Sequence, residues 1–172
     1  MRSEKLQKLT LAGVFAALTA IFTLLIQIPS PTKGYINTGD VIVNLSAWVL
    51  GPVYGAAAAG IGSAMADLIS GYTVYAPATL IIKAGMAAVS YLVYKRISGK
   101  QKSFPALFAG AAAAEIVMIL GYAVFAGVLY GSLGSAVLSI PENIVQGVFG
   151  AAVSSAVYTA LRRRSTKLHT VL

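Results

Sequence analysis

Long runs of apolar residues alternate with short polar breaks along the whole chain. Most runs are close to the roughly 20 residues that an α-helix needs to cross about 30 Å of hydrocarbon. The runs lie at about 9–28, 40–50, 53–69, 77–94, 104–129 and 141–161. We therefore predict an all-α integral membrane protein, in which residues 1–172 form a single transmembrane domain, a six-helix bundle.

The run at 40–50 is shorter than the others because Gly51 and Pro52 interrupt the apolar pattern. About eleven helical residues are too few to cross a bilayer upright. We expect this helix to begin inside the membrane. The preceding loop, which is rich in Pro and Gly over 29–39, is then expected to fold over it.

Composition excludes several classes of protein. The chain is 58% hydrophobic and 10% charged, with a mean hydropathy of +0.80, which excludes a monomer in water. It has no cysteine, and its one histidine is His169, so disulfides, thiolate metal sites and histidine-based catalysis are excluded. No phosphate-binding loop of the Walker type is present. We predict no catalytic residues, cofactor or metal, and ATP hydrolysis would have to come from other subunits.

Positive charge gathers in three clusters, at residues 2–8, 95–102 and 162–167, which hold 11 of the 13 Lys and Arg residues. With six crossings, all three clusters fall on one side of the membrane. The positive-inside rule then predicts that both termini are cytoplasmic in a multi-pass plasma-membrane protein. Because topology and the lipid bilayer account for these cations, nucleic acid is not an expected partner.

Ionisable residues inside the apolar runs are few and therefore informative, because a charge in hydrocarbon is costly and usually faces the bundle interior. Asp67 and Lys83 fall at similar depth below the outer ends of their helices. They predict a structural ion pair, or one of them contacts a ligand. Glu115 lies near mid-span with no cation expected at its depth. It either binds a partner from outside or is protonated and bonds a backbone carbonyl.

Further polar residues converge on the outer half of the bundle. Tyr122 lies on the same helical face as Glu115, and the two side chains suit a small polar ring. The amides of Asn143 and Gln146 share a face, and Asn37 lies in the loop at the same mouth. These five residues are the predicted substrate-binding set, with hydrogen bonds between helices as the alternative for the amides.

Two patterns have a structural interpretation as well. Ser139 and Glu142 have the spacing of a capping box around Pro141, which predicts that the last helix begins there. Ala12, Ala16 and Ala20 recur every four residues and form a face of small side chains. Such a face either packs inside the bundle or docks onto a separate membrane subunit.

Four stretches, "GYINTGD", "GSAMADLISGYTVYAPATLIIKAG", "AEIVMILGY" and "SIPENIVQGVFG", resemble the substrate-binding S components of energy-coupling factor (ECF) transporters. The resemblance covers about residues 12–150 and is closest to the subgroup for pyridoxine-like or hydroxymethylpyrimidine-like compounds. It implies a six-helix S-component fold that captures a vitamin or precursor from outside. It also implies docking, through the small residues of the first helix, onto a transmembrane coupling subunit served by two ATPases.

The leading hypothesis is therefore a membrane-embedded binding subunit for a small water-soluble vitamin or precursor. Two other classes stay open from the residues alone. One is an autonomous proton-coupled carrier or channel that uses Glu115 as its proton site. The other is a membrane enzyme acting on lipids, which is disfavoured because Glu115 lies far from the headgroups.

Overall fold

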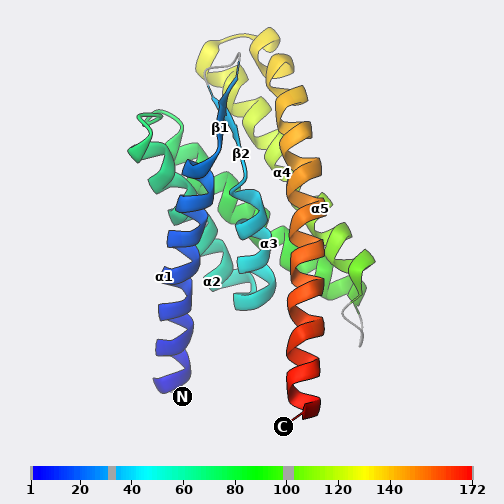
Figure 1. Ribbon diagram of the computed structural model, residues 1–172. Helices are drawn as coiled ribbons and strands as arrows, with labels where there is room; N and C mark the ends of the chain where they lie inside the picture. Colours follow the sequence, from blue (N-terminus) through cyan, green and yellow to red (C-terminus); the bar gives the residue numbers. More distant parts are fainter. Residues whose placement is uncertain (1, 31–33, 99–102, 172) are drawn as a thin grey trace.

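The computed structural model describes residues 2–30, 34–98 and 103–171, with side chains from 4 to 164 within these ranges (Figure 1). The described residues form five helices and one small antiparallel hairpin. The elements are α1 (Arg2–Leu25), β1 (Gln27–Pro29), β2 (Tyr35–Asn37), α2 (Asp40–Ile69), α3 (Ala76–Ser98), α4 (Phe104–Tyr130) and α5 (Leu133–Val171). All five helices are long and apolar enough to cross a membrane.

Helix α2 consists of two arms that meet at a sharp kink. Gly51 adopts φ 82° and ψ −178°, outside the helical region, and Pro52 cannot donate a helical hydrogen bond. The arms then pack closely, since Ser46 Oγ, whose hydrogen bonds mainly to the Val43 carbonyl, lies 3.2 Å from the carbonyl oxygen of Gly55 across the kink. The segments expected at 40–50 and 53–69 correspond to these two arms, which are counted together as one of the five helices of the described residues.

Helix α5 begins earlier than expected. Gly131, in the left-handed region at φ 60°, ends α4, and Ser132 Oγ accepts a hydrogen bond from the Gly134 N–H at 3.1 Å. Ser132 is therefore the N-terminal cap of α5. The predicted capping box is wrong, since Pro141 lies inside the helix and the Ser139 hydroxyl donates to the carbonyl of Ala136 at 2.8 Å.

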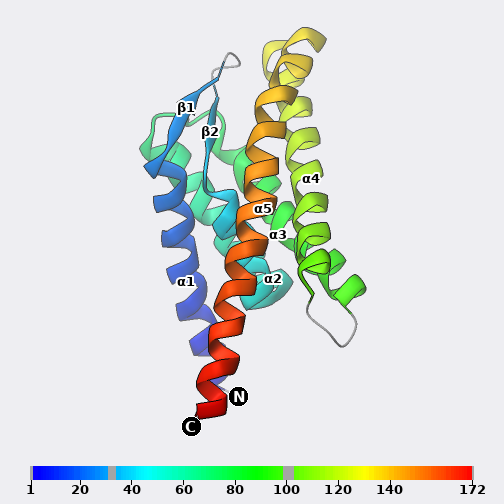
Figure 2. The ribbon, with the colours of Figure 1, turned by 45° about the vertical axis from the view of Figure 1, so that its right-hand side comes forward.

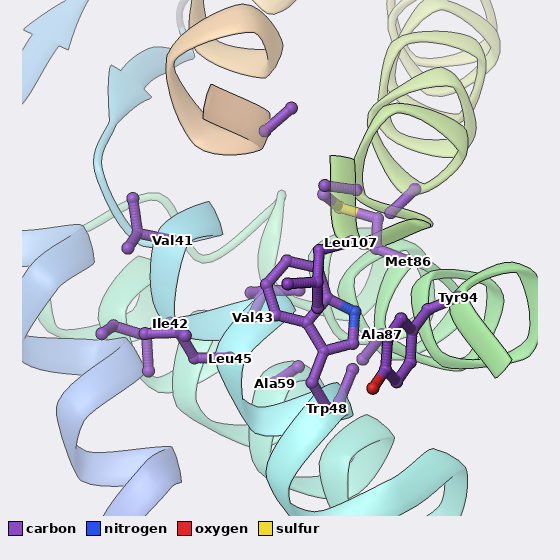
Figure 3. Packing of buried hydrophobic residues seen from close by; sticks show 14 of the residues in the cluster. Val41, Ile42, Val43, Leu45, Trp48, Ala59, Met86, Ala87, Tyr94 and Leu107 are labelled. Carbon is purple, nitrogen blue, oxygen red and sulfur yellow. The ribbon is translucent and has the colours of Figure 1, made fainter. Parts of the chain in front are cut away.

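The helices pack as a sequential bundle around the first arm of α2. Helix α2 contacts α1, α3 and α5, and α4 packs between α3 and α5. Trp48, on the first arm, lies in the middle of the apolar core (Figure 3). Its ring is 5.4 Å from that of Tyr158 and 6.2 Å from that of Tyr94, between ring centroids. The core thus fixes the short arm between α3 and α5.

The two ends of the bundle differ. Both termini lie at one end, and the β-hairpin lies at the other (Figures 1 and 2). The described cations of the three basic clusters belong to the helix ends near the termini and are exposed on the surface: Lys5, Lys8, Lys95, Arg96, Arg162, Arg163 and Arg164. Lys100 and Lys102 lie outside the described residues, as do the side chains of Arg2, Lys167 and His169.

Candidate functional site

A cavity opens beneath the β-hairpin at the end of the bundle away from the termini. Its space, including the part open to solvent, is about 540 Å³. All five helices and β2 contribute to it. Most of its lining is polar: Thr23, Tyr35, Asn37, Ser63, Asp67, Tyr75, Thr79, Lys83, Tyr122, Ser139, Glu142, Asn143 and Gln146.

Four of the five predicted substrate-binding residues line this cavity. They are Asn37, Tyr122, Asn143 and Gln146, which come from β2, α4 and α5. The Tyr122 hydroxyl is 3.0 Å from Thr79 Oγ1. The Asn143 amide donates to the Ser139 carbonyl at 2.8 Å. The structure therefore gathers amides and a phenol from distant parts of the chain around one space.

The inner end of the cavity is a bonded cluster that we call the floor, formed by Asp40, Lys83 and Gln146. Lys83 forms a salt bridge with Asp40 Oδ1, and Gln146 Nε2 donates to Asp40 Oδ2 at 2.5 Å. The other end of the Gln146 amide accepts the backbone N–H of Asn37 at 2.8 Å. Gln146 therefore ties β2 to the buried ion pair.

The ion pair expected between Asp67 and Lys83 is wrong, because Lys83 bonds Asp40 instead. Asp40 is the first residue of α2, where the positive end of the helix dipole favours a carboxylate. The first arm begins inside the bundle, which brings that carboxylate to the depth of Lys83. The sequence places each residue along its own helix but does not say which helices face each other.

Glu115 does not line the cavity, unlike the prediction. Its Oε1 accepts a hydrogen bond from Asn44 Nδ2 at 3.1 Å, and Asn44 Oδ1 in turn accepts the Ser90 hydroxyl at 2.7 Å. Gly150 lies between Glu115 and Asp40, since a Cβ there would be 2.8 Å from Glu115 Oε1 and 3.0 Å from the Asp40 Cβ. Glu115 is thus on the far side of the floor from the ligand space.

The side of the cavity near α1 carries residues that the sequence reasoning missed or assigned differently. We call Thr23, Ser63 and Asp67 the α1–α2 wall; all three are buried and line the cavity. The Tyr35 hydroxyl, from β2, donates to Asp67 Oδ1 at 2.5 Å. The signal for this wall was the four-residue spacing of Ser63 and Asp67, which puts both on one helical face.

Tyr35 stays a hydrogen-bond donor over the whole physiological pH range. Burial raises the pKa of its hydroxyl above the usual value for tyrosine, and the nearby carboxylate of Asp67 raises this pKa further. Its ring is also 4.7 Å from that of Tyr72, between centroids. The β-hairpin is therefore held to α2 by a protonated phenol and to the turn after α2 by a ring contact.

The small-residue face of α1 packs mainly inside the bundle. Ala12 is buried against Leu50 and Ala58 of α2, and Ala16 packs against the same cluster. Ala20 is half-buried. Small side chains let the two helices approach closely, which is the structural interpretation of this pattern.

A polar cavity enclosed by membrane-spanning helices and closed by a hairpin defines a membrane-embedded binding protein for a small solute. The sequence model of the family "ECF-type riboflavin transporter, S component" matches residues 3–163. The chain therefore belongs to this family of S components. It is a multi-pass plasma-membrane transport protein, not an enzyme. S components of ECF transporters bind small vitamins and work with a coupling subunit and two ATPases.

The chain is also similar to individual proteins. An uncharacterized protein of Pyrococcus woesei is 37% identical over 145 residues, which cover 84% of this chain and 94% of the relative. The thiamine precursor transporter HmpT of Lactococcus lactis subsp. cremoris is 28% identical over 95% of this chain and 92% of its own length. A solved S component of a bacterial ECF transporter has the same fold, with a TM-score of 0.74 at 23% identity, covering 95% of this chain and 98% of that one.

Proposed function

We propose that this S component captures a small water-soluble vitamin or vitamin precursor with a single polar ring, of the hydroxymethylpyrimidine or pyridoxine type. The observation that carries the proposal is the polar cavity under the hairpin, where Tyr122, Asn143 and Gln146 meet. A phenol can pack against a ring, while amides bond ring nitrogens and hydroxyl groups. The relative named as a thiamine precursor transporter supports this ligand class.

The direction of capture follows from the charge distribution. The exposed cations near the termini favour a cytoplasmic position for that end, so the hairpin and the cavity would face the outside. On this proposal the ligand enters beneath β2 from outside. Release inside would then depend on the coupling subunit and the ATPases, since this chain has no ATP-binding motif.

We also propose that the coupling subunit docks on α1. Ala17 and Gly13 are exposed beside the packed face of Ala12, Ala16 and Ala20. Small exposed residues allow close approach of another helix. Ala17→Trp should leave ligand binding intact and abolish uptake in cells that hold the partner subunits. Ala16→Trp is a weaker test because Ala16 also packs against α2. Normal uptake by Ala17→Trp would contradict this docking surface.

Ligand binding by the purified chain in detergent tests the main proposal. Native mass spectrometry identifies any co-purified molecule, and isothermal titration then compares hydroxymethylpyrimidine, pyridoxine and riboflavin. We expect one single-ring ligand per chain. Riboflavin binding alone would contradict the ring class, and riboflavin is included because the family model bears its name.

Matched variants connect the ligand to the cavity. Asn143→Ala and Tyr122→Phe should weaken binding at least tenfold, because each removes a hydrogen-bonding group that lines the cavity. Gln7→Ala, on the exposed start of α1, and Tyr54→Phe, outside the cavity, are the controls. Equal affinities for cavity variants and controls would contradict the site.

The autonomous carrier is the competing function. Its proton site, Glu115, contacts Asn44 and lies behind the floor rather than in the cavity. Uptake into liposomes that contain this chain alone, driven by a pH gradient and lost in Glu115→Gln, would favour the carrier. We expect no uptake without the partner subunits.

A further inference from the structure

Three buried polar atoms of the α1–α2 wall are left without hydrogen-bond partners. Within the described part of the chain, Thr23 Oγ1, Ser63 Oγ and Asp67 Oδ2 have no hydrogen bond of normal geometry, although the Thr79 hydroxyl is close enough to interact with the Asp67 carboxyl group. The residues are only 3%, 1% and 4% exposed. A buried polar atom without a partner is destabilising and uncommon in native proteins. Three such atoms on one side of one cavity indicate that a ligand supplies what they lack.

The three atoms come from two helices held in close contact. A Cβ on Gly62 would be 2.8 Å from the Thr19 Cβ, so α1 and α2 nearly touch one turn below the wall. Thr23 is one turn above Thr19, and Ser63 and Asp67 are one turn apart on α2. The wall is therefore built on rigid helices rather than on a loop.

The chemistry of the wall selects a hydrogen-bond donor. Asp67 Oδ1 already accepts the Tyr35 hydroxyl, and Oδ2 is a further acceptor. Lys83 also lines the cavity, but its charge is balanced by Asp40. The remaining acids in the lining, Asp67 and Glu142, favour a ligand group that carries positive or partly positive hydrogen atoms.

An amino group on an aromatic ring fits this wall better than a hydroxyl group does. It presents two N–H donors in the plane of the ring, so it can bond Asp67 Oδ2 and a neighbouring hydroxyl oxygen together. A hydroxyl group has only one hydrogen to donate, and an oxo group has none. An oxo group would also bring its lone pairs against the carboxylate.

We propose that the α1–α2 wall recognises an exocyclic amino group on the ligand ring, with Asp67 Oδ2 as its main acceptor and the Ser63 and Thr23 hydroxyls beside it. This inference rests on the proposed function and narrows it to aminopyrimidine-type ligands. The site also rejects the oxo analogue, because discrimination is strongest when the wrong group leaves buried polar atoms unpaired. Pyridoxine, which has no amino group, binds more weakly.

The test compares two ligands and two proteins by isothermal titration of the full chain in detergent. The ligands are hydroxymethylpyrimidine with its amino group and the analogue with an oxo group in that place. We expect the wild-type chain to bind the amino ligand at least tenfold more tightly. Asp67→Asn replaces an acceptor by an N–H donor of the same shape. This variant should bind the amino ligand at least tenfold more weakly than the wild type does. It should bind the oxo ligand as tightly as the wild type does, or more tightly.

The controls separate recognition from folding. Glu4→Gln makes the same change at an exposed acid of α1 and should leave both affinities unchanged. Thermal melting of each variant reports folding. If Asp67→Asn does not fold, the double variant Thr23→Val/Ser63→Ala still tests the wall. Its affinity for the amino ligand should fall at least threefold, and its affinity for the oxo ligand should not change.

Each outcome decides one proposal. An unchanged amino-to-oxo ratio in Asp67→Asn, or tighter binding of the oxo ligand by the wild-type chain, overturns this inference. Binding of pyridoxine at an affinity equal to that of the amino ligand also overturns it but leaves the proposed function standing. Failure to bind any vitamin or precursor overturns the proposed function itself.

Discussion

Asp40 and Asp67 are both buried carboxylates of α2, yet their surroundings differ: Asp67 lines the cavity, while Asp40 lies behind Lys83 and Gln146, which line it. Asp40, 1% exposed, has both oxygens bonded, one to Lys83 and one to Gln146. Asp67, 4% exposed, has one oxygen bonded to Tyr35 and the other without a partner among the described residues. The floor is electrostatically complete without a ligand, and the α1–α2 wall is not.

The same helix therefore serves two purposes. A complete network of charge and hydrogen bonds fixes the position of the first arm of α2 and, through Gln146, of β2. An incomplete set of polar atoms destabilises the empty protein slightly but supplies binding energy when a matching ligand enters. We therefore expect floor variants to change stability most and wall variants to change ligand affinity most.

The largest effect should come from breaking the floor. Lys83→Met removes the cation and leaves Asp40 buried with only Gln146 as partner. Loss of one member of a buried pair costs about 3–5 kcal/mol. We expect a large fall in the thermal midpoint in detergent, together with low yield of folded protein.

The matched double variant separates charge from packing. Asp40→Leu/Lys83→Met removes both charges, and replacing a whole buried pair by apolar residues is often neutral. It should recover much of the stability lost in Lys83→Met. A double variant as unstable as the single one would show that the ion pair does not set the stability of the floor.

A smaller effect is expected where α5 approaches the floor. In Gly150→Ala the new Cβ would be 2.8 Å from Glu115 Oε1, so packing must shift at a cost of about 1–3 kcal/mol. In Gly13→Ala, on α1, the new Cβ meets no atom within 4 Å, and the higher helix propensity of Ala stabilises by about 0.5–1 kcal/mol. The thermal midpoint should fall in Gly150→Ala and rise in Gly13→Ala. Equal shifts in the two variants would contradict the close packing at Gly150.

The sequence predicts the outline of this fold because membrane spans carry a strong pattern. The apolar runs anticipate where the helices lie, and Gly51 and Pro52 mark the kink of α2. Polar residues are rare in such a background, so Asn37, Tyr122 and Gln146 could be singled out, and the structure brings them to one cavity. Their role in binding remains a prediction.

Other features could not be read from one chain. The sequence suggested Asp67 as the partner of Lys83, whereas the packing of the first arm of α2 brings Asp40 to Lys83. Glu115 shares a helical face with Tyr122 but lies behind the floor. The sequence predicts the depth of a side chain along its helix, but it does not show which neighbouring residues cover that side chain. Pro141 fits either the start or the interior of a helix, and the turn at Gly131 and Ser132 decided between them.

The smallest effect contrasts two buried serines of α2. Ser46 Oγ donates to the Val43 carbonyl at 2.8 Å, so Ser46→Ala loses a buried hydrogen bond worth about 1 kcal/mol. Ser63 Oγ has no partner among the described residues, so Ser63→Ala removes a penalty. Ser63→Ala should leave the stability of the ligand-free chain unchanged or raise it by up to about 1 kcal/mol.

Thermal melting without and with saturating ligand distinguishes the two variants. Ligand should raise the thermal midpoint of Ser46→Ala as much as that of the wild type, and it should raise the midpoint of Ser63→Ala by less. If ligand stabilises both equally, Ser63 belongs to the packing of α2 and not to the ligand site.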